Sequence, residues 1–544
     1  SGTPGAPVVF TSLEDDSAGG DTNHDGTATL PAPDHWRGVM LQSGSASSTL
    51  VDTHVRYAGR LQLPGIRVAD DVTLRSCTVL SCNSDGIQLT GSARPIIEDC
   101  LVDSCGQVAY ADCEWGALSG FANNQAVNNG GNYVSVSSGA VGVDDRVFAH
   151  SAPHGVVVVT ANPSFTATSS LILEAGVIVK MSFDRQFSVL NGRFEARGTS
   201  FAPVVMTSFV DDDFGGDSNN NGASSVAGDY WRGLSVGLGA LPSKLDHLWI
   251  RGAGRLGRPG CSIDNAGVQA TALRADHCND EGIQVSDLAG DAENWIADHC
   301  AKGIVLSAGT WNLVHATVAD CSVAGLTGTG WTGSVLNTIA WNNASNYVGI
   351  ADSQLVNSNG SATAAGMNGN LDLDPLFVDP ATGDYHLQAM SPCLGMADVT
   401  TAHATLVDWD EGSRLADDDL SGNVLPDMGA FERITWHLDV QGAPSLGSTM
   451  TFTLAGSATG FGLLLVDFAS ASHEFFPDYG YLLIGLSSQV SIAATLTANL
   501  PFPAVIPNIP TLVGFPFEVQ GIVLLSSDPS RGNFTQRYRG KVSP

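Results

Sequence analysis

The sequence predicts an all-β protein in which an internally duplicated, right-handed parallel β-helix is followed by an antiparallel β-sandwich. Short apolar runs of strand length recur about every 20–25 residues, each followed by Asn, Gly or Asp, as in the stacked coils of a β-helix. In addition, residues 7–38 are repeated as residues 203–233, and matching positions keep an offset of 195 or 196. A repeat at a fixed offset indicates a repetitive architecture.

Length, charge and hydropathy bound the class of protein. With 544 residues, the chain is long enough to hold several structural units. Its formal charge of −31 disfavours binding to nucleic acid or to anionic membranes, and it favours bound cations and a saline or extracellular setting. Because no apolar run reaches 18 residues, we expect no membrane-spanning helix.

In chain order, residues 1–121 form a first β-helix block that is incomplete at its N-terminus, and residues 122–350 form a second block. The Asn- and Gly-rich stretch 122–150 at the start of the second block is expected to be a loop or an edge hairpin. Residues 351–433 are irregular and turn-rich. Residues 434–544 have few charges among long β-prone runs, which predicts a separate β-sandwich.

The ten cysteines are spaced like the coils. Cys77 and Cys100 are 23 residues apart, and Cys278, Cys300 and Cys321 are separated by 22 and 21 residues. We expect the last three to form one column on successive coils. Small buried hydrophobic side chains are the preferred interpretation. Disulfides between coils are the alternative, because rungs about 4.8 Å apart lie within the Cα separation that a disulfide tolerates.

The chain starts at Ser1, part-way through a repeat and without an initiator Met or a signal peptide, so we expect a processed or truncated product. A β-helix that starts with an unfinished coil exposes unpaired backbone groups and an apolar lumen. One hypothesis is therefore self-association head to tail into an extracellular filament, with the sandwich of the next subunit covering this end. The alternative is that Ser1 reflects proteolysis or disordered upstream residues.

Several segments resemble known families. The segment from LILEAGVIVKM to WRGL resembles the right-handed β-helix repeats of bacterial secreted and surface proteins. DPLFVDPATGDYHLQAMSPCLGMAD, with the later DMGAFE, closely resembles the choice-of-anchor Q class of β-helix surface proteins, in which such a stretch closes the helix. The last domain is similar to small C-terminal β-domains of exported planctomycete and myxobacterial proteins. These resemblances imply a secreted or cell-surface protein but no particular reaction.

An acidic loop present in both copies is the strongest chemical signal. The hexapeptides that start at Asp21 and Asp217 match D-x-[DN]-x-[DN]-G, the first half of a calcium loop. No Glu occupies position 12, so the loop is not an EF-hand, and the alternative is a solvated Asn/Asp-rich turn. We predict at least two Ca²⁺ sites, because calcium takes six to eight oxygen ligands and both copies supply acidic neighbours. The predicted ligands are Asp15, Asp16, Asp21, Asn23, Asp25 and Asp34 in the first copy, and Asp211, Asp212, Asp217, Asn219, Asn221 and Asp229 in the second.

Two further features carry weaker signals. The run Asp417–Asp419, with Ser421 and Asn423, is a third acidic segment that has a metal-binding composition. Trp36 and Trp231 each precede an Arg-Gly pair. They are expected to cap the coil core, and a sugar-stacking platform is the alternative.

The usual enzymatic chemistries of this fold have little support. A polysaccharide lyase needs an Arg or Lys base beside a calcium-bound uronate, and the chain has four lysines and no basic cluster. A glycosidase needs carboxylates on adjacent coils; Asp85 and the pair Asp280–Glu281 are candidates but also suit turns before Gly. We therefore expect a structural or adhesive surface protein whose partners are copies of itself or surface glycans, and not nucleic acid. A polysaccharide-active lyase or glycoside hydrolase is the alternative.

Overall fold

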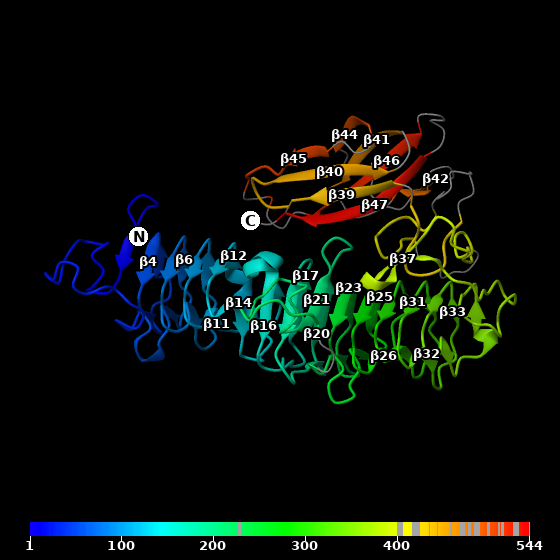
Figure 1. Cartoon of the computed structure of the whole chain (residues 1–544), viewed down its shortest axis with the longest axis horizontal. Coiled ribbons are helices and arrows are strands. Elements are labelled where there is room, and N and C mark those ends of the chain that lie inside the picture. Colours follow the sequence, from blue (N-terminus) through cyan, green and yellow to red (C-terminus); the bar gives the residue numbers. More distant parts are fainter. Residues whose placement is uncertain are drawn as a thin grey trace.

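The computed structural model shows a long parallel β-helix with a β-sandwich lying alongside it (Figure 1). Coils stack along the long axis, and the sandwich lies beside the middle and later coils. No α-helix occurs within the residues that the structure describes, so this part of the chain has no helix that is long and apolar enough to cross a membrane. The structure describes all residues except 227–229, 400–405, 416–424, 435, 443, 457–459, 468–473, 477–479, 483–489, 498–500, 510–511, 513–515, 526–531 and 543–544.

The strand pairs of the first coils are parallel, so each coil hydrogen-bonds to the next along three faces. The register shifts only within the pair of β11 and β14. One face contains β1 (Val8–Phe10), β4 (Thr53–Arg56), β7 (Thr78–Leu80), β10 (Leu101–Asp103) and β13 (Gln125–Val127). A second contains β3 (Thr49–Val51), β6 (Thr73–Arg75), β9 (Ile96–Glu98) and β12 (Phe121–Ala122). The third contains β2 (Val39–Leu41), β5 (Ile66–Val68), β8 (Ile87–Leu89), β11 (Val108–Cys113) and β14 (Gly131–Val136).

The later coils continue the same parallel stacking, with strands of 2 to 9 residues. One face contains β19 (Phe187–Val189), β22 (Leu234–Val236), β24 (Cys261–Asp264), β26 (Glu281–Asp287), β29 (Lys302–Leu306), β32 (Ala324–Gly328) and β35 (Tyr347–Val348). The other faces contain β15 (Asp145–Val147), β16 (Val156–Val159), β17 (Ser170–Glu174), β18 (Ile178–Met181), β20 (Arg193–Arg197), β21 (Val204–Ser208), β23 (Ser243–Arg251), β25 (Val268–Asp276), β27 (Ala292–Glu293), β28 (Ile296–Asp298), β30 (Leu313–Val314), β31 (Thr317–Ala319), β33 (Val335–Leu336), β34 (Ile339–Trp341) and β36 (Leu355–Val356). Six short 3₁₀ turns connect them: η1 (Arg60–Gln62), η2 (Trp115–Gly120), η3 (Ala149–Ser151), η4 (Pro153–Gly155), η5 (Asp352–Gln354) and η6 (Pro380–Thr382).

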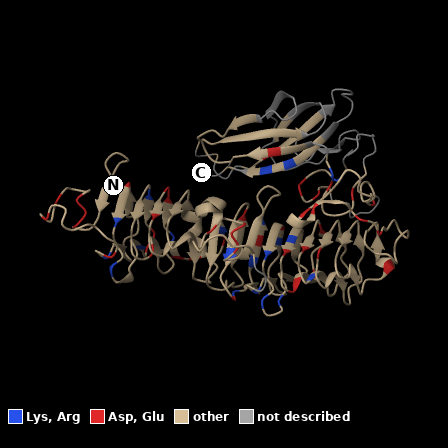
Figure 2. Ribbon diagram, in the orientation of Figure 1, with Lys and Arg blue, Asp and Glu red and all other residues tan. Residues whose placement is uncertain are grey.

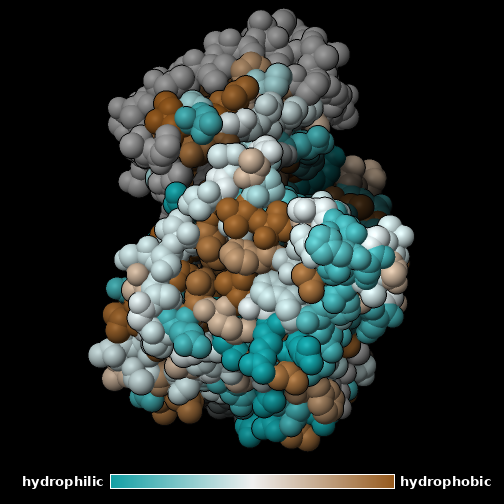
Figure 3. Space-filling model, turned by 90° about the vertical axis from the view of Figure 1, so that its left-hand side faces the viewer, coloured by the Kyte–Doolittle hydropathy of each residue, from teal (hydrophilic) through white to brown (hydrophobic). Residues whose placement is uncertain are grey.

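The lumen of the helix is apolar because alternate residues of each strand point inward. Ile66, Ile87 and Tyr110 occupy successive rungs of one inward column, and all three are fully buried. Fully burying such a side chain stabilises the fold by about 1.5–3 kcal/mol. Figure 3 looks onto the N-terminal end and shows hydrophobic residues gathered over the centre of that end, with more hydrophilic residues around them.

Three columns of buried cysteines mark the coils, and each column ends in an asparagine. The strand register places Cys278, Cys300 and Cys321 on successive coils, as expected, with Asn343 on the next. Cys100 and Cys105 are likewise followed by Asn124 and Asn129. All ten cysteines are buried free thiols.

Each terminal asparagine uses its side chain to satisfy the backbone of the preceding coil. Asn129 Oδ1 accepts a hydrogen bond from the Cys105 N–H at 2.8 Å, and its Nδ2 donates to the Val102 carbonyl at 3.0 Å. Asn124 binds Cys100 and Ile97 in the same way. The Asn-rich stretch 122–150 therefore contains regular coil strands, and the expectation of a loop or edge hairpin there was wrong. Asn124 and Asn129 are buried ladder residues, whereas Asn123 and Asn128 are exposed and have positive φ angles, as the composition suggested.

Residues 351–433 extend the last coils and then pack along one flank of the helix. The short antiparallel hairpin of β37 (Phe377–Asp379) and β38 (Asp384–Leu387) joins an apolar cluster that includes Ile296, Ile339 and Trp409. Backbone contacts fix this packing, since the Gly429 N–H donates to the Asn337 carbonyl at 2.8 Å. The segment thereby ties several coils together along one side.

The C-terminal domain consists of antiparallel sheets that enclose an apolar core including Leu438, Phe452 and Tyr538. This arrangement agrees with the predicted β-sandwich. One sheet has the order β39 (Trp436–Gln441), β40 (Thr449–Gly456), β45 (Pro501–Val505). The other has the order β44 (Val490–Thr497), β41 (Gly460–Asp467), β46 (Pro516–Leu525), β47 (Gly532–Lys541), and the hairpin of β42 (Glu474–Phe476) and β43 (Gly480–Leu482) completes the domain.

Candidate metal centre

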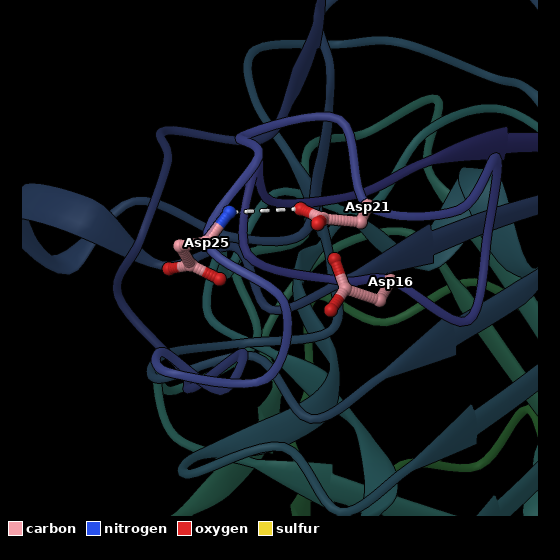
Figure 4. Close-up of side chains that lie close together, drawn as sticks. All are labelled: Asp16, Asp21 and Asp25. Carbon is pink, nitrogen blue, oxygen red and sulfur yellow. Dashed lines mark hydrogen bonds between the residues drawn. The ribbon is translucent and has the colours of Figure 1, made fainter.

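Loop 1 (residues 13–30) follows β1 and brings three carboxylates together. One oxygen from each of Asp16, Asp21 and Asp25 lies within 4.8 Å of the other two, and Figure 4 shows the three side chains facing one another. Asp21 holds the turn, because its Oδ1 accepts from the Asp25 N–H at 3.1 Å and its Oδ2 from the Gly26 N–H at 2.9 Å. Gly26 has a φ of 70°, so the sharp reversal suits glycine. Loop 1 lies at the left end of the helix in Figure 2.

Two oxygens of this group lack hydrogen-bond donors. Asp16 Oδ1 and Asp25 Oδ1 are both shielded from solvent, and neither has a partner among the described residues. Burial raises the pKa of Asp16, and repulsion from the neighbouring carboxylates raises it further. Buried carboxylate oxygens normally have a partner, and a cation would serve as one. An all-oxygen set suits a hard cation such as Ca²⁺.

The remaining predicted ligands of loop 1 have other positions. Asn23 lies within the turn, where its Oδ1 accepts from the Asp25 N–H at 3.3 Å. Asp15 is buried and faces away from the group, accepting from Thr11 Oγ1 at 2.6 Å and lying 3.6 Å from Arg56. Burial raises the pKa of Asp15, but hydrogen bonds from Ser17 and Thr11 outweigh this effect and lower it. Asp34 is exposed and is not part of the group of three.

Loop 2 (residues 209–226) repeats the backbone scaffold of loop 1. Asp217 Oδ1 accepts from the Asn221 N–H at 3.1 Å, and Asp217 Oδ2 accepts from the Gly222 N–H at 2.9 Å. Asn219 Oδ1 also accepts from the Asn221 N–H, at 3.1 Å. Asp212 Oδ1 is shielded and has no hydrogen-bond partner among the described residues, as in the first copy. The duplication therefore extends to individual hydrogen bonds.

The contacts that hold loop 2 against the β-helix also occur in the first copy. Asp211 is fully buried, accepts from Thr207 Oγ1 at 2.5 Å and pairs with Arg251 at 3.2 Å. These contacts correspond to those of Asp15 with Thr11 and Arg56. Asp229 and the acidic run from Asp417 to Asn423 lie outside the described residues.

The two loops differ in their electrostatic surroundings. Asn221 occupies the position of Asp25, so loop 2 has one carboxylate fewer. Loop 2 also covers Lys180 of β18, which is fully buried and donates from Nζ to the Gly216 carbonyl at 2.8 Å and to Ser218 Oγ at 2.9 Å. Burial lowers the pKa of Lys180, while Asp212 and the other acidic residues of the loop oppose this shift. The sequence analysis missed this lysine because it occupies an ordinary strand.

A polar pocket of about 430 Å³ lies over β8, β11 and β14 and is a second candidate site. Asp85 and Asp112 line it, and Gln88 Nε2 donates to Asp112 Oδ2 at 2.8 Å. Arg67 in turn donates to Gln88 Oε1 at 3.0 Å. Burial raises the pKa of Asp85, and Asp112 raises it further. Sequence reasoning singled out Asp85 but missed Asp112, since the two become neighbours only when coils stack.

The tryptophans beside the acidic loops belong to the core, as expected. Trp231 is fully buried and donates from Nε1 to the Arg251 carbonyl at 2.8 Å. Trp36 is half-buried against the same core cluster and donates to the Arg56 carbonyl at 2.7 Å. These contacts hold each acidic loop to the following coil.

Comparisons with known proteins agree with the fold. The family model described as "Right handed beta helix region" matches residues 33–172, and no curated protein matches the sequence. A similar solved structure is the full-length tailspike protein 2 from Escherichia coli O157:H7 bacteriophage CAB120, at 11% identity and a TM-score of 0.13. The alignment covers 94% of this chain and 64% of the tailspike chain, and a match at this level gives no information about activity. The stacked coils and the family match together show that this is a right-handed parallel β-helix protein.

Proposed function

We propose that this is a secreted or cell-surface protein with a structural and adhesive role, whose first acidic loop binds Ca²⁺. The observation that carries the proposal is the group of Asp16, Asp21 and Asp25, in which two shielded oxygens lack donors. The formal charge of −31 supports an extracellular setting rich in divalent cations. The resemblance of residues 374–432 to choice-of-anchor Q surface proteins supports the compartment.

Calcium binding is tested by thermal unfolding. A ligand that binds only the folded state stabilises it by about 2.7 kcal/mol at 100 times its Kd. We expect EGTA to lower the melting temperature and added calcium to restore it. Asp21→Asn should abolish this response, whereas Asp144→Asn, which removes an exposed carboxylate elsewhere, should keep it. An EGTA-insensitive wild-type melt, with no calcium in elemental analysis, would contradict the proposal.

The adhesive role is supported by the polar pocket, which is lined mainly by amides, hydroxyls and carboxylates. Such groups hydrogen-bond to sugar hydroxyls, and they lie on successive rungs spaced at about 4.8 Å, which suits an extended chain of sugars. Asp85 and Asp112 make the pocket acidic, so a neutral or amino-sugar polysaccharide fits better than a polyuronate. Pull-down with neutral polysaccharides should succeed, and Gln88→Ala should weaken it. Binding that depends on uronic acids would argue against this ligand class.

A polysaccharide-active enzyme is the second candidate, because Asp85 and Asp112 share one pocket and burial raises the pKa of Asp85. Two carboxyl groups in one pocket, one of them with a raised pKa, suit general-acid catalysis of glycoside hydrolysis. A reducing-end assay on the polysaccharides that bind would test this activity. Asp85→Asn should then abolish release of reducing ends while leaving binding measurable.

Self-association is the third component of the proposal. It is supported by β45, an edge strand of one sheet of the C-terminal sandwich, on which Val505 is exposed. Edge strands offer unpaired N–H and C=O groups to another chain. Sedimentation velocity over a concentration series should reveal oligomers that grow with concentration. Monomers at every concentration in the presence of calcium would exclude this component.

A further inference from the structure

Lys180 is a charged side chain on the outer surface of the β-helix, yet it is fully buried. On β18 the neighbours Val179 and Met181 belong to the lumen core, so Lys180 points to the opposite, outer face. Loop 2 folds back over this face. The Asn132 N–H donates to the Ser218 carbonyl at 3.0 Å, and the rings of Tyr133 and Phe209 meet edge to face at 5.4 Å.

The ammonium group of Lys180 is held by the turn that forms the acidic motif. Its two hydrogen bonds go to Gly216 and Ser218, on either side of Asp217. A buried ammonium group is strongly destabilising unless it has hydrogen bonds and counter-charges. The carboxylates of Asp211, Asp212 and Asp217 supply these counter-charges.

Charge at equivalent positions differs between the two loops. Loop 1 presents Asp16, Asp21 and Asp25, a formal charge of −3. Loop 2 presents Asp212, Asp217 and the neutral Asn221, and Lys180 adds a positive charge, so that −2 + 1 gives −1.

We infer that Lys180 replaces the metal ion in loop 2, so that only loop 1 binds calcium. This inference rests on the proposed calcium binding and narrows it from two sites to one. The same turn is thus stabilised by a bound cation in one copy and by a cation built into the neighbouring strand in the other. Loop 2 keeps its structure without calcium, and calcium removal acts at the N-terminal coils alone.

The stoichiometry of calcium binding tests the inference, measured by isothermal titration with calcium chloride on the full-length protein. Wild type should bind one ion, and Asp25→Asn should bind none. The double variant Lys180→Met/Asn221→Asp should bind one ion more than wild type, because it restores the carboxylate and removes the ammonium group. Lys302→Met, which removes a half-exposed lysine paired with Glu281, should match wild type.

Two results would overturn the inference: two ions bound by wild type, or no gain in a folded double variant. If wild type binds no calcium but the double variant binds one ion, the proposed function of loop 1 fails while the role of Lys180 stands. Hydrogen–deuterium exchange of wild type covers the case in which the double variant does not fold. EGTA should speed exchange in residues 13–30 and leave residues 209–226 unchanged, and faster exchange in both loops would contradict the role of Lys180.

Discussion

Arg539 of the C-terminal sandwich contacts Asp246 of the β-helix, with a guanidinium nitrogen 3.6 Å from Asp246 Oδ2. The same side chain pairs with Glu411, which is 1% exposed, and the neighbouring Arg537 N–H donates to the Glu411 carbonyl at 2.9 Å. The ring of Tyr538 meets Phe201 of the helix at 5.3 Å. Three separate regions of the chain therefore meet on one charged cluster.

Arg539→Ala should loosen the sandwich from the helix, because it leaves the buried carboxylate of Glu411 without this counter-charge. Breaking a buried pair costs about 3–5 kcal/mol. Arg75→Ala removes an exposed partner of Glu98 and should change stability by about 0–1 kcal/mol. Chemical denaturation compares the two, and limited proteolysis should release the sandwich faster from the Arg539 variant. Equal behaviour of both variants would show that this contact does not hold the domain.

His386 should make stability fall at alkaline pH. Although its burial lowers the pKa, the hydrogen bonds that it donates to Asp384 and Asp410 at 2.6 and 2.7 Å raise the pKa to about 10. Since this value exceeds that of an unfolded histidine, about 6.5, the contribution is fully present below pH about 6.5 and is lost as the pH rises through about 10. Melting temperatures of His386→Gln should fall less than those of wild type between pH 7 and 10. A parallel pH profile would contradict the charged histidine.

The thiols of the cysteine columns should be unreactive in the folded protein. All ten cysteines are buried, which keeps a reagent away from their sulfur atoms. Burial also raises the pKa of Cys300 well above its ordinary value, which disfavours its reactive thiolate. A thiol reagent such as DTNB should label none of them in native protein and all ten after unfolding without reductant. Fewer than ten labelled thiols after unfolding would indicate the disulfides between coils that the cysteine spacing also allows.

Adjacent residues of β8 should differ sharply in their effect on stability. Ile87 is fully buried in the lumen between Ile66 and Tyr110, and Ile87→Ala should destabilise the protein by about 2–5 kcal/mol. Gln88 points outward into the polar pocket, and surface substitutions usually stay within about 0.5 kcal/mol. Urea unfolding curves of Ile87→Ala and Gln88→Ala should show this contrast. Similar losses would mean that the register of β8 is misassigned.

The local sequence predicts the coil architecture, but it does not predict that the asparagine-rich stretch 122–150 forms coils. Strand length and the cysteine spacing predict the columns because each coil repeats the same inward positions. Asn124 and Asn129 were mistaken for turn residues because single-residue composition cannot distinguish an exposed amide from one that bonds to the previous coil. That difference depends on a partner more than 20 residues away.

The candidate site was predictable to a similar degree. The spacing of Asp21, Asn23 and Asp25 predicts the turn that Figure 4 shows, because its hydrogen bonds lie within six residues. Asp16 belongs to the group of carboxylates and Asp15 does not, because their side chains point in different directions. The order of the residues in the sequence does not determine these directions. Lys180 lies 36 residues before its hydrogen-bond partner Gly216, so no local pattern could reveal its role.

Residues 377–433, the flank segment, pack along one side of the β-helix. They determine which coils can be gained or lost without disturbing the rest of the molecule. In a solenoid each coil contacts only its neighbours, so whole coils can be gained or lost without disturbing the rest. Coils spanned by residues 377–433 lack this freedom, because Asn294, Thr317 and Asn337 each anchor the segment at a fixed rung. In the described chain the flank segment has no such anchors on β5, β8 and β11. The number of N-terminal coils can therefore vary, and the length of the β-helix varies with it. The C-terminal half keeps its length.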